Sequence, residues 1–163
     1  MTYLICSDIH GDERTFDKLL KIKEKMHADA IISAGDFCPT MNMEVAAYNM
    51  DFRTVMGNCD RYHTYSLLST PRDYISFEHE GRNVVVTHGD HYFPSMFELK
   101  DGDIFISGHT HAGLLEKERG IILFNPGSPS RPRDGRKSFG ILSEKSLALL
   151  SLPFCRPIKV LEL

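Results

Sequence analysis

Short apolar runs recur along this chain, and five of them stop at aspartate, asparagine or histidine. Runs of this length, bounded by polar and glycine residues, are typical of buried strands. The side chains that follow them are Asp8, His10, Asp36, Asn58, His88, His109 and His111. In open α/β sheets, ligands collect outside the carboxyl ends of the strands. The pattern therefore predicts that five strand ends meet at one site.

Helical patterns separate the first three runs. Residues 12–15 are acidic and small polar, as at a helix start, and Phe16, Leu19 and Ile22 follow at helical spacing. Residues 43–50 repeat apolar positions at i, i+3, i+4 and i+7, which is one face of a second helix. Residues 62–68 are long enough for two more helical turns. The first half thus predicts two strand-helix units and a third strand.

The second half alternates as hairpins do. Residues 74–79 alternate and connect through residues 80–83 to a strand over 84–86, and further hairpins are expected over 114–124 and 139–152. A last strand is expected over 158–163, and a short helix over 94–99 is expected to lie over the site. This order favours an α/β fold with two packed sheets flanked by helices over a doubly wound single sheet.

Length, composition and charge limit the number of domains and the classes of partner. A chain of 163 residues with 42% apolar and 25% charged residues, and with no internal repeat or linker, fits one domain over residues 1–163. The formal charge of -3 provides no basic field, which argues against general nucleic-acid binding and against an anionic membrane as partner.

The cysteines and the N-terminus bear on localisation. Cys6, Cys38, Cys59 and Cys155 form no CxxC pair, so neither a disulfide framework nor a thiolate zinc site is indicated. The apolar stretch at residues 4–6 is far too short for a signal peptide, and no run approaches the roughly 20 apolar residues of a membrane span. We expect a cytoplasmic protein with Cys6 as inert core.

The polar side chains at the five strand ends form a chemically coherent set. Four imidazoles, two carboxylates and one amide are too many for one ion and suit two. Nitrogen and oxygen donors without thiolate favour divalent manganese, iron, zinc, cobalt or nickel. If Asp36 bridges, each ion has about four protein ligands and keeps a position for water.

Charge indicates the reaction. Two divalent ions bring four positive charges, Asp8 and Asp36 bring two negative charges, and a bridging hydroxide brings one more. The surplus of about one positive charge attracts an anion and stabilises a five-coordinate phosphorus, and a hydroxide between the ions is nucleophilic near neutral pH. The donors predict metal-assisted hydrolysis of a small phosphate ester.

Five motifs in this order resemble the calcineurin-like metallophosphoesterase superfamily: Asp8-Ile9-His10, Gly35-Asp36, Gly57-Asn58-Cys59-Asp60, Thr87-His88-Gly89 and Gly108-His109-Thr110-His111. The third motif and Asn125-Pro126-Gly127-Ser128 further resemble its small single-domain prokaryotic branch, the YfcE-like phosphodiesterases. The resemblance covers nearly the whole chain.

The resemblance implies a four-layer α/β/β/α sandwich of two mixed β-sheets flanked by helices, and a dinuclear site, often active with manganese. One metal ion would take Asp8, His10, Asp36 and His111, and the other would take Asp36, Asn58, His88 and His109. Phosphodiester or monoester substrates are implied, and related small enzymes are commonly homo-oligomers.

The third motif supplies the candidate catalytic residues Asn58, Cys59 and Asp60. Larger phosphatases of the superfamily carry histidine after the asparagine, placed to protonate the leaving group, whereas this chain has Cys59. Thiols are uncommon general acids. We therefore expect Cys59 to face the substrate without acting as the acid, and esters with acidic leaving groups to react best.

Two other functions remain open. One is a phosphomonoesterase acting on a small metabolite, which extra cations in the pocket would favour; Arg61, Arg131 and Arg133 are the candidates. The basic stretch within residues 126–137 is either a solvated loop or a phosphate-facing one. The other is a catalytically silent scaffold, because a retromer subunit has the same fold.

The remaining histidines are expected to have lesser roles. His27 and His79 are expected at the surface. His63 and His91 lie within a few residues of the site motifs and are candidates for substrate contact.

Overall fold

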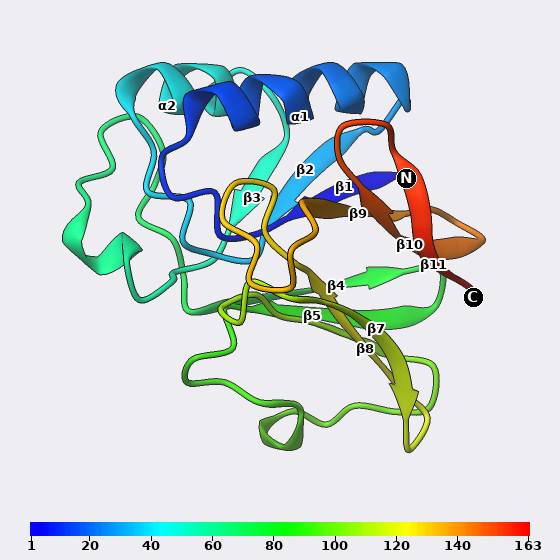
Figure 1. Ribbon diagram of the computed structural model, residues 1–163. Helices are drawn as coiled ribbons and strands as arrows, with labels where there is room; N and C mark the ends of the chain where they lie inside the picture. The colour runs from blue at the N-terminus through cyan, green and yellow to red at the C-terminus, as the bar shows by residue number, and fades with distance from the viewer.

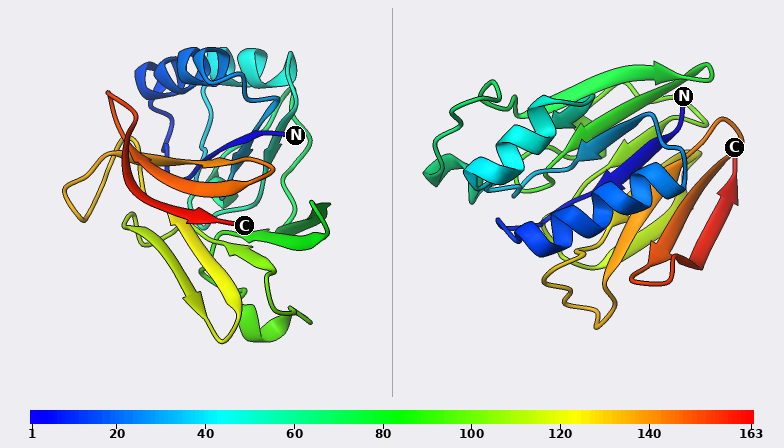
Figure 2. Two further views of the ribbon diagram at one scale, coloured as in Figure 1. Left: turned by 90° about the vertical axis from the view of Figure 1, so that its right-hand side faces the viewer. Right: turned by 90° about the horizontal axis from the view of Figure 1, so that it is seen from above.

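The computed structural model describes residues 1–163 and contains two β-sheets that pack face to face (Figures 1 and 2). The first sheet has the order β11-β10-β9-β1-β2-β3. Its strands are β1 (Tyr3–Cys6), β2 (Ala30–Ser33), β3 (Phe52–Thr54), β9 (Ser138–Leu142), β10 (Ser146–Ser151) and β11 (Arg156–Glu162).

The second sheet has the order β4-β5-β6-β8-β7. Its strands are β4 (Tyr74–His79), β5 (Arg82–Thr87), β6 (Ile104–Ile106), β7 (Gly113–Glu118) and β8 (Ile121–Pro126). Both sheets are mixed, because each joins three parallel strands to antiparallel neighbours. The expected fold of two packed mixed sheets is confirmed.

Two α-helices cover the outer face of the first sheet, as the left view of Figure 2 shows. In α1 (Glu13–Lys25), the Asp12 side chain caps the first turn by accepting a hydrogen bond from the Thr15 amide at 3.0 Å. Phe16 and Leu19 of this helix are fully buried against the sheet. α2 (Met41–Tyr48) is capped in the same way by Thr40. No helix of the structure combines the length and apolar character needed to cross a bilayer.

The central strands are mostly apolar because both of their faces are buried. Leu4 and Cys6 of β1 pack in the cluster beneath the helices, while Tyr3 and Ile5 pack in the cluster between the sheets. Two cores therefore lie on either side of the first sheet, and the burial of Cys6 agrees with its expected role.

The outer face of the second sheet carries no α-helix. The connection from β5 to β6 crosses it with a single 3-10 turn, η2 (Pro94–Met96), and the Phe97 ring packs 5.9 Å from that of Phe105. The expected helix over residues 94–99 is thus one turn, and it lies on this outer face rather than over the site (Figure 1). Contacts of the Phe97 ring with those of Phe105, Tyr74 and Tyr92 take the place of a helix face, so the fourth layer of the sandwich is a loop.

Residues 62–68 do not form two helical turns. A 3-10 turn, η1 (Asp60–Tyr62), is followed by irregular chain. The backbone amides of Ser66 and Leu67 donate to the Glu44 carboxylate of α2, at 2.9 and 3.2 Å, so a side chain satisfies donors that a helix would bond internally.

The three predicted hairpins and the last strand are confirmed by the antiparallel pairs β4–β5, β7–β8, β9–β10 and β10–β11. The expectation that His79 lies at the surface is wrong. His79 is buried, its Nε2 lies 2.9 Å from the Ser143 carbonyl oxygen, and its ring meets Tyr3 edge-on. Alternation along β4 places it on the same face as Ile75 and Phe77, and that face is covered by the first sheet.

The carboxyl ends of the parallel strands gather at one edge of the sandwich. β1, β2 and β3 are parallel in the first sheet, and β5, β6 and β8 are parallel in the second. In Figure 1 these ends point to the left, away from the two chain termini. Side chains from both sheets can therefore meet at this edge.

Candidate metal centre

The loops after five parallel strands bring all seven predicted donors together. The first sheet contributes four donors: Asp8 and His10 after β1, Asp36 after β2 and Asn58 after β3. The second sheet contributes three: His88 after β5, and His109 and His111 after β6.

The backbone at this edge is unusual. Five of the seven donors have a left-handed backbone: Asp8 (φ 55°), His10 (52°), Asp36 (51°), His109 (67°) and His111 (57°). This conformation costs a residue with a side chain about 1–2 kcal/mol, and it persists only where the surrounding structure imposes it. The backbone strain is concentrated at the residues whose side chains are expected to bind metal.

One group of donors surrounds Asp8. Its Oδ2 atom accepts a hydrogen bond from the His109 amide at 3.0 Å, whereas its buried Oδ1 atom has no hydrogen-bond partner. Nε2 of His111 lies 3.2 Å from this Oδ1 atom and 3.3 Å from Nε2 of His10. A buried carboxylate oxygen that lacks a donor and faces two imidazole nitrogens is the arrangement that a cation would satisfy.

A second group surrounds Asn58. Its Oδ1 atom lies 3.1 Å from Nε2 of His88 and 3.2 Å from Nδ1 of His109. An amide oxygen and two imidazole nitrogens again converge on one point.

Asp36 lies between the two groups. Its Oδ1 atom accepts a hydrogen bond from the Cys59 amide at 2.8 Å. Its Oδ2 atom lies 3.6 Å from Nε2 of His10 in one group and 3.4 Å from Nε2 of His88 in the other. One carboxylate oxygen is therefore shared by both groups.

Backbone carbonyls orient two of the imidazoles. Nδ1 of His88 lies 2.8 Å from the Ala34 carbonyl oxygen, and Nδ1 of His111 lies 2.7 Å from that of Arg131. A carbonyl can only accept, so Nδ1 carries the proton in both rings. When either ring is neutral, its Nε2 lone pair is then directed at the centre, as in metal-ligating histidines.

The pKa values reflect the crowding of charge. Burial alone would lower the pKa of His88, but the carboxylates of Asp36 and Asp8 outweigh it and raise the pKa to about 9. Burial would raise the pKa of Asp36, but His88 and the Cys59 amide lower it to about 2. Burial also raises the pKa of Asp8 and lowers that of His10. The charged forms of His88 and Asp36 are thus stabilised by each other, whereas burial disfavours charge on Asp8 and His10.

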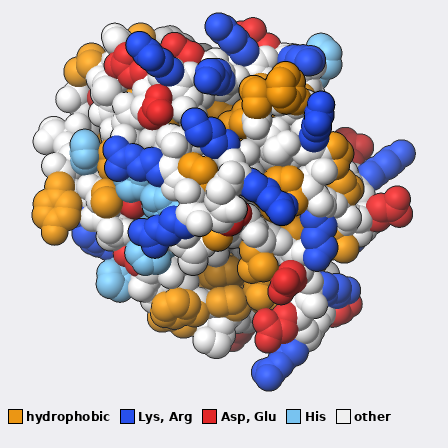
Figure 3. Space-filling model, in the orientation of Figure 1, with side chains coloured by type: hydrophobic (Ala, Val, Ile, Leu, Met, Phe, Trp, Pro, Cys, Tyr) orange, Lys and Arg blue, Asp and Glu red, His pale blue; other side chains and the backbone are white.

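A cavity of about 350 Å³ opens over the donors. Its lining consists of His10, Asp36, Asn58, Cys59, His109, His111, Arg131 and Arg133. The thiol of Cys59 has a pKa raised by burial and by the charge of Asp36. In Figure 3, Lys and Arg side chains flank histidines on the left side of the molecule, where the strand ends lie.

Asp60 does not reach this cavity. Its carboxylate is buried and accepts hydrogen bonds at 2.8 Å from the amides of Asp36, Cys38 and Gly57 and from the Tyr65 hydroxyl. The three amide bonds hold the loops that carry Asp36 and Asn58. The contacts are those of a positioning residue rather than of a catalytic one.

The remaining candidates lie outside the cavity lining. Arg61 is exposed and pairs with Asp73 at 3.3 Å, which matches the surface-pair alternative. His27, His63 and His91 are exposed, and His91 lies 3.4 Å from Asp90.

The loop after β8 donates hydrogen bonds to the backbone of the loops that carry Asp8 and His109. Asn125 donates to the Gly108 carbonyl oxygen at 2.8 Å, and Ser128 donates to that of Asp8 at 2.8 Å. Ser130 donates to the carbonyl oxygens of Asp8 and Ile9, at 3.0 and 2.9 Å. Asn125 and Ser128 belong to a motif that is visible in the sequence, whereas Ser130 is not, because an isolated serine in a polar loop carries no signal.

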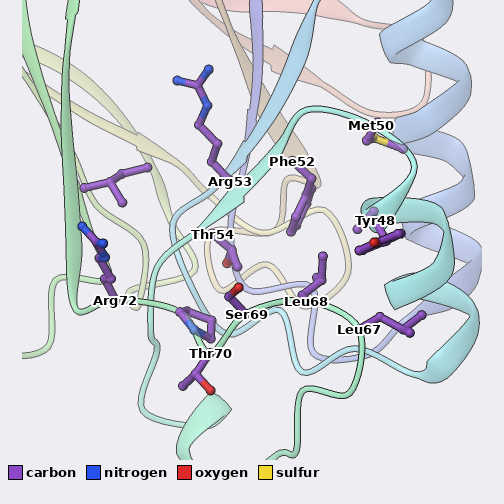
Figure 4. Close-up of a pocket in the computed structure, with 13 residues that line it drawn as sticks. Tyr48, Met50, Phe52, Arg53, Thr54, Leu67, Leu68, Ser69, Thr70 and Arg72 are labelled. Atoms are coloured by element: carbon purple, nitrogen blue, oxygen red, sulfur yellow. The ribbon is translucent and has the colours of Figure 1, made fainter.

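A separate hollow of about 410 Å³ lies beside β3, between α2 and residues 67–72 (Figure 4). Its lining includes Tyr48, Phe52 and Leu67, and none of the seven donors. Arg53 in this lining is paired with Asp51 at 2.8 Å. The convergent polar chemistry therefore lies at the strand ends and not in this hollow.

Comparison with known proteins agrees with this geometry. Residues 1–146 match the family model described as the calcineurin-like phosphoesterase superfamily domain. The phosphodiesterase YfcE of Escherichia coli is 27% identical, with 93% of this chain and 92% of that protein covered. A probable metallophosphoesterase of Methanocaldococcus jannaschii is 32% identical, and the alignment covers 85% of this chain and 73% of that protein.

Solved structures show the same fold. The structure of YfcE, a phosphoesterase from E. coli, superposes with a TM-score of 0.85 at 25% identity and covers 99% of this chain and 98% of that one. Vacuolar protein sorting 29 of Cryptosporidium parvum shares the fold at a TM-score of 0.72 and 16% identity. The superposition covers 99% of this chain and 96% of that one. By sequence and by structure, this chain belongs to the calcineurin-like phosphoesterase superfamily.

Proposed function

We propose that this chain is a phosphodiesterase that hydrolyses small phosphate esters with two divalent metal ions bound at the strand ends. The observation that carries the proposal is the Oδ2 atom of Asp36, shared between two groups of donors, together with the unpartnered buried Oδ1 atom of Asp8. Such a pair of groups needs cations to be stable.

The residues that would hold the two ions follow from the two groups. Asp8, His10, Asp36 and His111 would hold one ion, and Asp36, Asn58, His88 and His109 would hold the other. Bound there, divalent ions lower the pKa of coordinated water and neutralise charge on the phosphate. The chain itself orients His88 and His111 through backbone carbonyls and fixes Asp36 through the Cys59 amide.

We propose manganese as the preferred metal, with iron, zinc, cobalt and nickel as alternatives. Imidazole and carboxylate donors suit all of these ions. We also propose that residues 1–163 act as one domain in the cytoplasm and assemble as a homo-oligomer. Scattered cysteines, of which none forms a disulfide, support a reducing compartment.

Two observations favour an active diesterase over the alternatives. All seven donors are present and converge, whereas a catalytically silent scaffold would have no use for so many polar groups, three of them fully buried or nearly so. The relative with 93% coverage is named as a phosphodiesterase. A monoesterase acting on a small metabolite is the second candidate, because Arg131 and Arg133 line the cavity.

A metal-by-substrate activity matrix tests the proposal. Purified protein is stripped with chelator, reloaded with each ion and assayed on mono- and bis-nitrophenyl phosphate, with Asp36→Asn as the inactive control. We expect metal-dependent turnover that Asp36→Asn abolishes, together with a loss of bound metal. A protein that binds no transition metal and stays inert with manganese would leave the scaffold as the function.

The leaving group should matter strongly. The raised pKa of Cys59 makes its thiol a weak acid, so the chain has no good proton donor beside Asn58. We expect nitrophenyl esters to react at least about 100-fold faster than alkyl esters, since general acid catalysis is worth about 10²–10⁴-fold. Cys59→Ser should preserve this ratio; similar rates on both ester types would show that an acid is present.

A further inference from the structure

The loop between β8 and β9 brings basic residues to the edge of the metal centre. It is the amber loop between the two sheets in Figure 1, and cations beside the histidines are visible in Figure 3. Arg131, Arg133, Arg136 and Lys137 all belong to it. Arg131 and Arg133 line the cavity over the donors, and Arg136 and Lys137 do not.

Hydrogen bonds fix the backbone of this loop to the donors themselves. The Arg131 carbonyl oxygen lies 2.7 Å from Nδ1 of His111, and the Arg133 amide donates to the His111 carbonyl oxygen at 2.9 Å. The Arg131 amide donates to Oγ of Ser128 at 2.8 Å, and Ser128 is itself bound to Asp8. The backbone that carries the two arginines is therefore fixed relative to the centre.

Neither guanidinium group has an ion-pair or hydrogen-bond partner within the protein. Arg53 and Arg61, by contrast, pair with Asp51 and Asp73. The nearby Asp134 carboxylate accepts from the amides of Gly113 and Arg136 instead, at 2.9 and 3.0 Å. Two exposed side chains thus bring positive charge to the cavity lining without a counter-ion, and guanidinium forks are suited to bidentate binding of phosphate.

This charge exceeds what a simple phosphodiester requires. A diester has one negative charge, which the surplus charge of the proposed metal ions already balances. Two further guanidinium groups beside the metals favour a ligand with more negative charge than that.

We propose that Arg131 and Arg133 form an anion subsite beside the metal centre, and that the preferred substrate places a second negative charge there. This inference rests on the proposed function. That charge has two chemical sources. It belongs either to the scissile group of a phosphomonoester, or to a further phosphate group that a diester carries next to the scissile one.

Three nitrophenyl substrates separate the sources. Bis-nitrophenyl phosphate has one charge, nitrophenyl phosphate has up to two on the scissile group, and a nitrophenyl diester whose alcohol bears a phosphate has its extra charge on a neighbouring group. The manganese-loaded wild type is compared with Arg131→Ala, Arg133→Ala, the double variant and the matched control Arg136→Ala, which alters the same loop outside the cavity.

We expect the wild type to prefer one of the two highly charged substrates. The double variant should lower kcat/KM for that substrate about 10- to 100-fold and change bis-nitrophenyl phosphate less than about threefold, as for loss of charge-assisted hydrogen bonds. The substrate whose kcat/KM falls in the double variant identifies the source of the second charge. Arg→Lys variants should recover part of the loss, and Arg136→Ala should resemble the wild type.

Calorimetric binding of inorganic phosphate to the manganese-loaded protein gives a readout without turnover. We expect about tenfold weaker binding by the double variant. The subsite is excluded by two results together. The double variant changes kcat/KM equally for all three substrates, or for none of them, and it binds phosphate as tightly as the wild type does. A manganese-loaded wild type that is inert on all three substrates would overturn the proposed function instead, while phosphate binding would still report on the arginines.

Discussion

Asp60 shows how a buried charge can organise a site without touching it. Three backbone amides and one hydroxyl donate to its carboxylate, all at 2.8 Å. The amides belong to the loops after β2 and β3, which carry Asp36 and Asn58. A carboxylate with this many donors fixes the spacing between a shared donor of the centre and its neighbour.

Replacing Asp60 by alanine should therefore destabilise the protein strongly. The change leaves four buried donors without an acceptor, which should lower the free energy of unfolding by at least about 3 kcal/mol. Chemical denaturation of the two proteins measures it. Asp73→Ala removes only exposed contacts, with Arg61 at 3.3 Å and with the Tyr92 hydroxyl at 3.4 Å, and should cost less than about 1 kcal/mol. Equal losses in both variants would contradict the positioning role of Asp60.

His88 should make the stability of the chelator-treated protein depend on pH. Its pKa is raised from an ordinary 6.5 to about 9 by Asp36 and Asp8 against the effect of burial. Protonated His88 therefore stabilises the folded state fully below pH 6.5, and this contribution disappears as the pH rises through 9. We expect a decrease of roughly 2–3 kcal/mol in the free energy of unfolding between these limits.

Denaturation of the chelator-treated protein between pH 6 and 10 measures this effect, and His88→Gln should flatten it. A wild-type profile as flat as that of the variant would show that His88 is neutral throughout. Since a metal binds the neutral imidazole, metal affinity should rise over the same range as the proton leaves.

At the scale of elements, strand-end loops approach one another so closely that glycine is required. A Cβ atom on Gly57, after β3, would overlap Oδ1 and the backbone nitrogen of Asp36, after β2. A Cβ atom on Gly108 would overlap Oγ of Ser7. The small residues of these motifs thus allow neighbouring loops to bring their donors into contact.

Gly57→Ala should accordingly separate the loops and weaken metal binding at least about tenfold, because the overlap is with backbone that cannot rotate away. Metal content after dialysis against a metal buffer measures it. Gly81→Ala is the control: its Cβ atom meets open space, and its left-handed backbone (φ 75°) costs about 1 kcal/mol of stability without reaching the site. Full metal content in Gly57→Ala would refute the close approach.

At the scale of the whole molecule, the centre joins the two sheets. Four donors come from the first sheet and three from the second, and Oδ2 of Asp36 meets Nε2 of His88 across the interface at 3.4 Å. Any ion bound by both sets would link the sheets to each other, so metal binding and folding should be coupled.

Manganese should therefore raise the melting temperature of the chelator-treated protein. At 100 times its dissociation constant, each ion adds about 2.7 kcal/mol, or about 5–10 °C for a chain of this length. Calorimetric melting with and without manganese measures the shift. Asp36→Asn, which alters the shared donor, should lose most of it, and Arg136→Ala should keep it. An unchanged melting temperature would argue against ions that link the sheets.

The sequence by itself determined the strands and the first helical layer, and it predicted the seven candidate donors. Each of these has a local cause: an apolar run followed by Asp, Asn or His, or a cap followed by apolar residues at helical spacing, as for Asp12 and Phe16. Local causes are visible in the order of residues, and the polar residue at the end of each apolar run indicated that the strand ends meet at one site.

Only the tertiary structure decided the features that depend on contacts between distant segments. Glu44 of α2 binds the amides of residues 66 and 67 and prevents a helix there, and the first sheet covers His79. Packing also separates Arg131 and Arg133, which face the donors, from Arg61, which pairs at the surface. The sequence shows which groups a residue can offer, but the fold determines which of them find a partner within the chain and which stay free for a ligand.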